Sequence, residues 1–246
     1  MSIILAIESS TELASVALLI AGSPQAGADR VASRQVGGVQ SHSQTVLPMV
    51  QALLAEAGIA LCACSAIAFG AGPGSFTGVR TACGIAQGLA YGSDLPVVAV
   101  DTLEAAAQAC RDATGAADVL VVLDARMGEV YWAQYRWEQA STEGDGRWIA
   151  VTAPRLDAPA LVTACGAVVA CGSGLSAHPA AFAAAPFAAT ARADIMPHAV
   201  AIATLGIGLL AAGKAVAARD AQPVYLRNDV ALTTAERAVR RAEAAA

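Results

Sequence analysis

The sequence contains little charge, few aromatic residues and almost no lysine. Charged residues make up 14% of its 246 positions and aromatic residues 4%, whereas 56% are hydrophobic. The 15 basic residues include a single lysine, Lys214, and the formal net charge is −5. This acidic balance argues against a protein that grips nucleic acid on its own. The apolar content excludes an extended, disordered chain.

Long apolar runs and leader sequences are also missing. No uninterrupted run of about 18 apolar residues occurs, so the sequence predicts no membrane-spanning helix. Residues 1–20 carry no basic leader and are interrupted by Glu8 and Glu12, which argues against a secretory signal peptide. We therefore expect a cytoplasmic protein without a membrane anchor.

The cysteines and histidines lack the spacings that bind metal. The six cysteines include no Cys-x-x-Cys pair, and no two of the three histidines lie three or four residues apart. We therefore expect reduced, buried cysteines and no metal site. Asp101 and Glu104, at a predicted helix start, are expected to be caps. Ser75 and Ser173 lack the flanking glycines of a nucleophile elbow, so a serine hydrolase is not predicted.

The apolar pattern of the first half alternates between strands and helices. Apolar runs at 3–8 and 13–20 flank a polar turn, which predicts a β-hairpin. Apolar residues at helical spacing begin at Val46 and end at Gly58, with Pro48 expected in the first turn. The same criteria predict further strands at 28–37, 65–69 and 97–100, and helices at 76–91 and 102–113.

The pattern then restarts. An apolar run at 119–123 ends in Asp124, a polar turn follows, and a second apolar run occupies 130–135. This repeats the opening hairpin, whose first run ends in Glu8, and indicates an internal duplication. We expect further strands at 147–152 and 167–171, and helices near 176–184 and 196–213.

The two related halves predict an α/β fold of two lobes, each a mixed sheet with helices. The boundary is expected near 103–117, where the second pattern begins. We therefore predict an N-terminal lobe at 1–105, a C-terminal lobe at 106–231 and a flexible tail at 232–246.

A glycine-rich segment at 70–78 lies between a predicted strand and a predicted helix. Such a loop can cradle a phosphate, yet this one lacks the lysine of a Walker loop and the spacing of a dinucleotide fingerprint. Phosphate binding and a tight structural turn therefore stay as alternatives. The acids that end each first strand could hold a magnesium-bound nucleotide or hydrogen-bond to their own turns. The nucleotide candidates are Glu8, Gly72, Gly74, Ser75 and Asp124.

The helix predicted at 76–91 carries a stripe of glycines. Gly84, Gly88 and Gly92 recur every four residues, and each interior glycine costs a helix about 1 kcal/mol relative to alanine. Another helix packed very close to the stripe would explain it. The apolar stripe of the preceding helix, with Leu47, Val50 and Leu54, is a candidate for that packing. The two helices could instead form a docking face for another protein.

Several segments resemble one family in order and spacing. The segments include ILAIESSTELASVAL, SHSQTVLPMVQALLAEAGI, AIAFGAGPGSFTGVRTACGIAQGLA, VDTLEAA, LDARMGEVYWA and PVYLR. The chain resembles the bacterial TsaB family, also called YeaZ, over 1–137 and 223–227. That family has the duplicated actin-like, sugar-kinase and Hsp70 fold. Glu8 departs mildly from the pattern, because many relatives have aspartate there.

The resemblance implies a part in making N6-threonylcarbamoyladenosine beside the anticodon of tRNA. It implies a heterodimer with the transferase TsaD and a third component in the ATPase TsaE. A homodimer through the helices at 44–58 and 76–91 is expected when the protein is alone, because an apolar docking face seldom stays bare. Contact with tRNA is expected only through the complex. It implies no cofactor of the protein's own, and leaves open ATP or ADP at the subunit interface.

The resemblance also implies a subunit without an active site. TsaD carries a His-x-x-x-His metal motif, and Thr102 and Ala106 stand at those two positions here. Docking to TsaD is expected through helices within 44–58 and 76–91. The alternative function is a small-molecule kinase or ATPase that uses Glu8, Asp124 and the loop at 72–78. The interface candidates are Leu47, Val50, Leu54, Arg80, Gly84 and Gly88.

Overall fold

The computed structural model describes residues 2–22, 29–37, 42–139 and 146–227. The predicted tail at 232–246 lies outside them. The first half forms a mixed sheet in the order β3-β2-β1-β4-β5. Each strand of this sheet confirms a predicted one. The antiparallel strands are β1 (Ser2–Glu8), β2 (Leu13–Ala21) and β3 (Arg30–Gly37), and β4 (Ala66–Gly72) and β5 (Val97–Asp101) run parallel to β1.

The second sheet repeats the pairing of the first. Its order is β8-β7-β6-β9. An antiparallel hairpin is extended by a third antiparallel strand, and a parallel strand pairs with the other side of the first strand. The predicted duplication into two lobes is therefore confirmed. The strands are β6 (Asp118–Asp124), β7 (Val130–Gln139), β8 (Gly146–Asp157) and β9 (Val169–Cys171).

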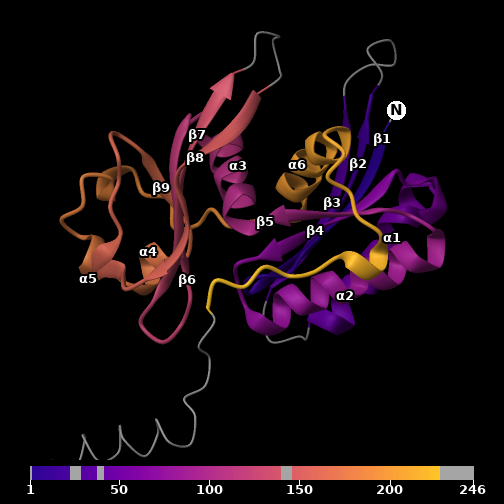
Figure 1. The fold of residues 1–246 in the computed structure, drawn as a ribbon, viewed down its shortest axis with the longest axis horizontal. Coiled ribbons are helices and arrows are strands. Elements are labelled where there is room, and N and C mark those ends of the chain that lie inside the picture. The colour runs from indigo at the N-terminus through magenta and orange to yellow at the C-terminus, as the bar shows by residue number, and fades with distance from the viewer. Residues whose placement is uncertain (1, 23–28, 38–41, 140–145, 228–246) are drawn as a thin grey trace, which may run out of the picture.

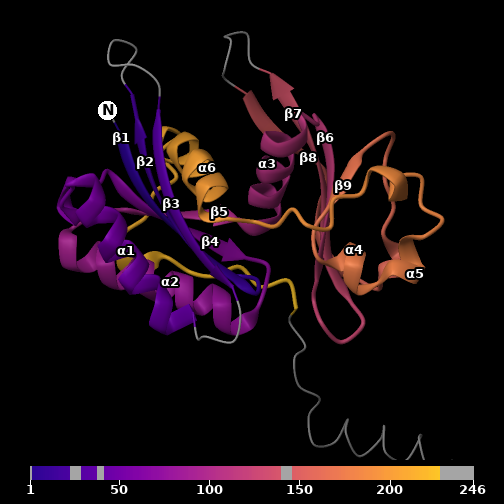
Figure 2. The ribbon, with the colours of Figure 1, turned by 180° about the vertical axis from the view of Figure 1, so that it is seen from behind.

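Helices cover both faces of each sheet (Figures 1 and 2). On the outer face of the first sheet lie α1 (His42–Ala57) and α2 (Phe76–Ser93). Between the two sheets lie α3 (Thr102–Thr114) and α6 (Ala199–Ala211). The far face of the second sheet carries α4 (Gly174–Ala177) and α5 (Pro179–Phe182). Short 3₁₀ turns occur at Leu61–Ala63, Pro159–Leu161, Ala188–Thr190 and Ala218–Asp220.

Alternation along β1 assigns its side chains to two different cores. Leu5 and Ile7 pack with the side chains of α1 and α2. Ile4 and Ala6 point to the opposite face and join a core that includes α3, α6 and strands of the second sheet. The lobes are therefore joined through this shared central core.

The C-terminal part of the chain returns to the first sheet, which the predicted division at 105/106 did not anticipate. Helix α6 packs on β1, β2 and β4, although it was assigned to 106–231. Val216 and Val97 exchange two backbone hydrogen bonds of 2.9 Å. Farther on, the Val224 N–H donates to the Ala71 carbonyl at 2.7 Å.

Three local predictions were wrong. Helix α1 begins at His42, so Pro48 lies in its second turn. The apolar stripe that starts at Val46 did not reveal the polar first turn. Gly70–Gly72 extend β4 and are not part of a loop. The helix expected at 176–184 is split into two single turns at Pro179, because proline disfavours helical backbone in the residue before it.

Two further findings concern the whole described part of the chain. No helix there is long and apolar enough to cross a membrane. All six cysteines are unpaired, but only four are buried; Cys62 and Cys165 are exposed, contrary to expectation.

One buried hydrogen bond ties the start of α6 to β2. The Ala199 N–H, in the first turn of α6, donates to Ser15 Oγ on β2 at 2.9 Å. Ser15→Ala leaves that donor buried without its partner, so we expect a loss of about 1–3 kcal/mol in the free energy of unfolding. Urea denaturation of Ser15→Ala and of Thr204→Ala measures this. Thr204, on the exposed face of α6, serves as the control, with an expected change of about 0.5 kcal/mol or less. Equal losses of stability in Ser15→Ala and Thr204→Ala would contradict the structural role of the Ser15 hydrogen bond.

Candidate functional site

The end of β1 and the turn that follows it contain three buried polar residues, Glu8, Ser9 and Ser10. Glu8 is fully buried, and its Oε1 accepts a hydrogen bond of 2.5 Å from the Ser10 N–H. Its Oε2 has no hydrogen-bond partner in the described structure. A Cβ atom at Gly70 would overlap the Glu8 carboxylate. Burial raises the pKa of Glu8 above its ordinary value, because the carboxylate loses its hydration, and the Ser10 hydrogen bond offsets only part of this rise.

The glycines of the 70–78 segment make room for this turn. A Cβ atom at Gly74 would lie 2.6 Å from Ser10 Cβ, and one at Gly78 would overlap the Ser9 carbonyl. Ser9 Oγ donates to the Gly78 carbonyl at 2.8 Å, and the Ser75 N–H donates to the Ser10 carbonyl at 2.7 Å. The glycines therefore have a structural role, which favours the interpretation as a tight turn.

The N-terminus of α2 is capped from within the chain. Ser75 is the N-cap, and its Oγ accepts from the Gly78 N–H at 3.4 Å. The Gly72 N–H donates to Thr102 Oγ1 at 3.1 Å. Thr102 and Ala106, at the metal positions of the resemblance, are both buried. The described residues contain no group of three or more His, Cys, Asp or Glu side chains that could hold a metal ion.

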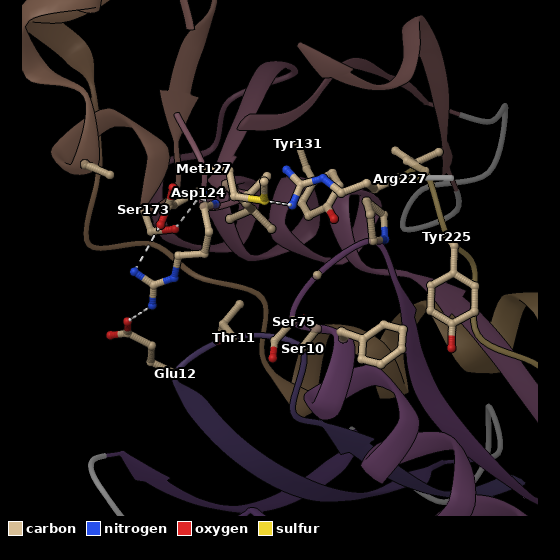
Figure 3. Close-up of a pocket in the computed structure, with 18 of the residues that line it drawn as sticks. Ser10, Thr11, Glu12, Ser75, Asp124, Met127, Tyr131, Ser173, Tyr225 and Arg227 are labelled. Atoms are coloured by element: carbon tan, nitrogen blue, oxygen red, sulfur yellow. Dashed lines mark hydrogen bonds and ion pairs between the residues drawn. The ribbon is translucent and has the colours of Figure 1, made fainter. Parts of the chain in front are cut away.

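A cavity of about 770 Å³ opens between the lobes (Figure 3). Ser10, Glu12 and Ser75 line it from the first lobe, and Asp124 and Ser173 from the second. Arg126 crosses between them, with nitrogens 2.7 Å from Glu12 Oε1 and 3.3 Å from Asp124 Oδ2.

Asp124 is engaged within its own lobe as well. Its backbone N–H donates to Ser173 Oγ at 3.1 Å, its Oδ1 accepts from the Arg126 N–H at 3.1 Å, and His178 Nε2 lies 3.5 Å from Oδ1. Each of its carboxylate oxygens therefore already has a partner.

The nucleotide candidates do not converge on one site. Glu8 does not line the cavity, Ser10 fills the space beside Gly74, and Asp124 is held by Arg126. A magnesium ion needs carboxylate oxygens that face the ligand, and a phosphate needs open backbone donors at the loop. The described structure therefore does not bring Glu8 and Asp124 together as ligands of one magnesium-bound nucleotide.

A second acidic group lies at the start of α3. Asp101 caps the helix, accepting from the Glu104 N–H at 2.9 Å and from the Tyr135 hydroxyl at 3.2 Å. The predicted cap is thereby confirmed for Asp101. Burial raises the pKa of Asp101, and burial together with the nearby Asp101 charge raises that of Glu104 to about 7.

The glycine stripe of α2 faces outward. Gly84, Gly88 and Gly92 are exposed, and a Cβ atom on any of them would have no neighbour within 4 Å among the described residues. The opposite side of the helix, with Ala82 and Ala86, is buried on the sheet. The stripe is therefore not covered by α1, contrary to one of the two predicted explanations.

The predicted interface residues on α1 differ in their exposure. Leu47 is 41% exposed, and Leu54 is partly buried. Val50 is only 2% exposed and packs in the core beneath α1. Its expected place on the contact surface is therefore wrong, because the α1 stripe that contains Val50 faces the sheet.

Arg80 is held by two aromatic side chains at the edge of the cavity. Its guanidinium carbon lies 3.6 Å from the ring centre of Phe76 and 5.6 Å from that of Tyr225. Its Nε donates to the Tyr225 hydroxyl at 2.8 Å. The sequence singled out Arg80 but missed both aromatic residues. The segment PVYLR, which contains Tyr225, was the available signal.

The duplicated lobes and the shared central core define a protein of the actin-like fold. The chain is 39% identical over 228 residues to the Escherichia coli (strain K12) tRNA threonylcarbamoyladenosine biosynthesis protein TsaB, which covers 93% of this chain and 96% of that protein. It is 44% identical over 140 residues to the Haemophilus influenzae protein of the same name, 57% of this chain and 56% of that one. The chain belongs to the TsaB family, whose members are tRNA threonylcarbamoyladenosine biosynthesis proteins.

A comparison with a solved structure and one with a family model are consistent with this family. The structure of YeaZ from Pseudomonas aeruginosa superimposes with a TM-score of 0.79 at 39% identity, covering 92% of this chain and all of that one. The family model for TsaD, tRNA N6-adenosine threonylcarbamoyltransferase, matches residues 28–146. The fold prediction from the resemblance is confirmed.

Replacing Glu8 by glutamine tests whether the pKa of its buried carboxyl group is raised in the folded protein. Its pKa is higher in the folded than in the unfolded protein, so above about pH 4.5 the unfolded chain loses this proton first and stability falls. Glu8→Gln removes this dependence. The free energy of unfolding of the variant minus that of wild type should rise with pH, by up to about 1.4 kcal/mol per unit, until the pH passes the folded pKa.

Urea denaturation across a pH series measures the effect. Glu138→Gln, which removes an exposed carboxylate on β7, is the control. If the difference in free energy of unfolding between Glu8→Gln and wild type stays constant with pH, the pKa of Glu8 is not raised by burial.

Proposed function

We propose that this chain is a non-catalytic subunit that docks a TsaD-type threonylcarbamoyltransferase through α1 and α2. In this role it holds the transferase in the conformation that modifies the tRNA adenosine, a shift of population between conformations. TsaE is the proposed third component, tRNA is met only through the complex, and the same helices pair two copies when the transferase is absent.

The exposed glycine ridge of α2 carries the proposal. Gly84 and Gly88 lie in the helix interior and cost about 1 kcal/mol each relative to alanine. No described side chain packs on them, so the isolated fold gains nothing from their lack of a Cβ. A helix of another protein that approaches at close range makes use of that absence. Leu47 is exposed on α1, the helix that contacts α2, and is the proposed apolar contact for the same partner.

The cavity supports a role without catalysis. Its acid Asp124 is paired with Arg126, and the helix N-terminus beside it is capped by the chain's own serine. The partly buried acids Asp101 and Glu104 cap and flank a helix start. These groups are engaged in holding the structure together, which leaves the chemistry to the partner.

Gly84→Leu tests the docking face. The new side chain has open space around it in the isolated protein, so we expect the fold to remain and its thermal midpoint to stay the same or rise. Affinity for purified TsaD should fall by at least about 100-fold, because a bulky residue prevents close helix packing. Isothermal titration calorimetry measures this.

Gly208→Leu is the matched control. Gly208 is also an exposed helical glycine with no neighbour within 4 Å of a Cβ, but it lies on α6, on the other face of the sheet. The Gly208→Leu variant should bind TsaD with the affinity of wild type. Unchanged affinity of Gly84→Leu would overturn the docking face.

Depletion of the protein in cells tests the pathway. We expect the threonylcarbamoyladenosine content of bulk tRNA, measured by nucleoside mass spectrometry, to fall and to be restored by wild type and Gly208→Leu but not by Gly84→Leu. An unchanged level would contradict the proposed function.

The alternative, a small-molecule kinase or ATPase acting in the cavity, is favoured only by the position of the cavity between the lobes. Calorimetry with Mg-ATP on the isolated protein distinguishes the two. We expect no tight binding and no turnover, because Asp124 is already paired with Arg126 and Glu8 does not line the cavity. Binding with turnover would support the enzyme instead.

A further inference from the structure

We propose that Arg80 is the anion-binding element of the docking face and binds a carboxylate side chain of the protein that docks along α2. This inference rests on the proposed function and adds the chemistry that the partner must bring. It also gives the segment at 221–227, which the proposed function does not use, a role in positioning Arg80.

The guanidinium of Arg80 is oriented in advance. Phe76 stacks on it at 3.6 Å, and the Tyr225 hydroxyl accepts from Nε at 2.8 Å. Within the described ranges, neither Nη nitrogen makes a hydrogen bond and no carboxylate lies within 4.0 Å of the group. Arg80 therefore presents unused donors in a fixed plane, which suits bidentate binding of a carboxylate.

Neighbouring arginines at the same cavity differ in this respect. Arg126 pairs with Glu12 at 2.7 Å and Arg227 with Glu129 at 2.6 Å. Their charges are compensated within the chain, whereas that of Arg80 is not compensated by any described acid. Charge complementarity therefore points to an acid on the partner.

The returning segment fixes Tyr225 in place. The Ala221 carbonyl accepts from Gln87 Nε2 at 2.9 Å and from Cys83 Sγ at 3.6 Å, both on α2. The Val224 N–H is bonded to β4 at 2.7 Å. Tyr225 follows directly, so its ring and hydroxyl reach Arg80 from an anchored backbone.

Arg80 lies on the same ridge as the glycines. Phe76, Arg80, Gly84 and Gly88 are spaced four residues apart, so they follow one face of α2. A partner helix seated on the glycines passes within one turn of Arg80. This continuity with the proposed interface favours a carboxylate of the docked protein over a small anion held in the cavity.

The affinity of the full chain for purified TsaD, measured by calorimetry at low and high salt, tests the inference. Arg80→Ala should weaken binding by about 10- to 100-fold, as expected for loss of hydrogen bonds to a charged group, and should reduce the salt dependence. Arg80→Lys keeps the charge but not the planar fork and should fall between Arg80→Ala and wild type. Arg147→Ala, which removes an exposed arginine on β8, should bind as wild type does.

Tyr225→Phe tests the positioning role. It keeps the ring but removes the hydroxyl that holds Nε, and we expect a loss of about threefold, within the range of a single hydrogen bond. The loss should vanish in the Arg80→Ala background, whereas a general structural effect would persist there. The thermal midpoint of each variant is measured as well. Midpoints equal to that of wild type show that a lower affinity does not come from unfolding.

Three outcomes separate this inference from the function on which it rests. If Gly84→Leu abolishes binding but Arg80→Ala binds normally, the docking face stands and the anion-binding role is overturned. If Arg80→Ala leaves TsaD affinity unchanged but abolishes binding of Mg-ATP, the anion is a small molecule and the inference is again overturned. If Arg80→Glu is rescued by a TsaD variant with one acid changed to arginine, the inference is supported.

Discussion

The contact between the β1–β2 turn and three glycines is the constraint on which the first lobe depends. Gly70, Gly74 and Gly78 are four residues apart and face Glu8, Ser10 and Ser9 in turn. The strand and the helix that they connect can approach the turn only because none carries a Cβ. The same contact buries Glu8 and places Ser10 where a loop-bound phosphate would need room. A segment that resembles a phosphate loop in sequence is thus used for packing.

The second constraint is the return of the chain to the first sheet. Helix α6 fills the space between the sheets, and its Gly206 approaches Ala68 so closely that a Cβ would lie 3.0 Å away. Separating the lobes would expose the apolar surface of this shared core. Segment 214–227 and the Arg126–Glu12 ion pair add further links. The shared core and these links hold the two lobes together, which suits the proposed role as a subunit that holds a partner.

The sequence predicted which segments form strands and helices better than it predicted what each of them packs against. Period-two and period-3.6 patterns located the strands, the helix at 76–91 and the duplication, because these depend on neighbouring residues. The place where α6 packs depends on distant residues such as Ser15, which is 184 positions from its partner Ala199. The nearly continuous apolar run of α6 points to no single face. Val50 was misplaced because a stripe shows which residues share a face of a helix but not what that face meets. Tyr225 was missed because its partner Arg80 is distant in sequence.

The glycines of the first lobe and of α6 fall into two groups. Gly70, Gly74, Gly78 and Gly206 each touch a group that a Cβ would displace, so the fold itself requires them. Gly84 and Gly88 touch nothing in the described chain, and at about 1 kcal/mol each they remove a noticeable part of a stability of about 5–15 kcal/mol. The proposed partner would offset this cost by packing closely on the bare backbone. Arg80 stands one turn away with donors that no described acid satisfies. The ridge therefore combines two features that suit the proposed contact, glycines without side chains and an arginine with no described acid beside it.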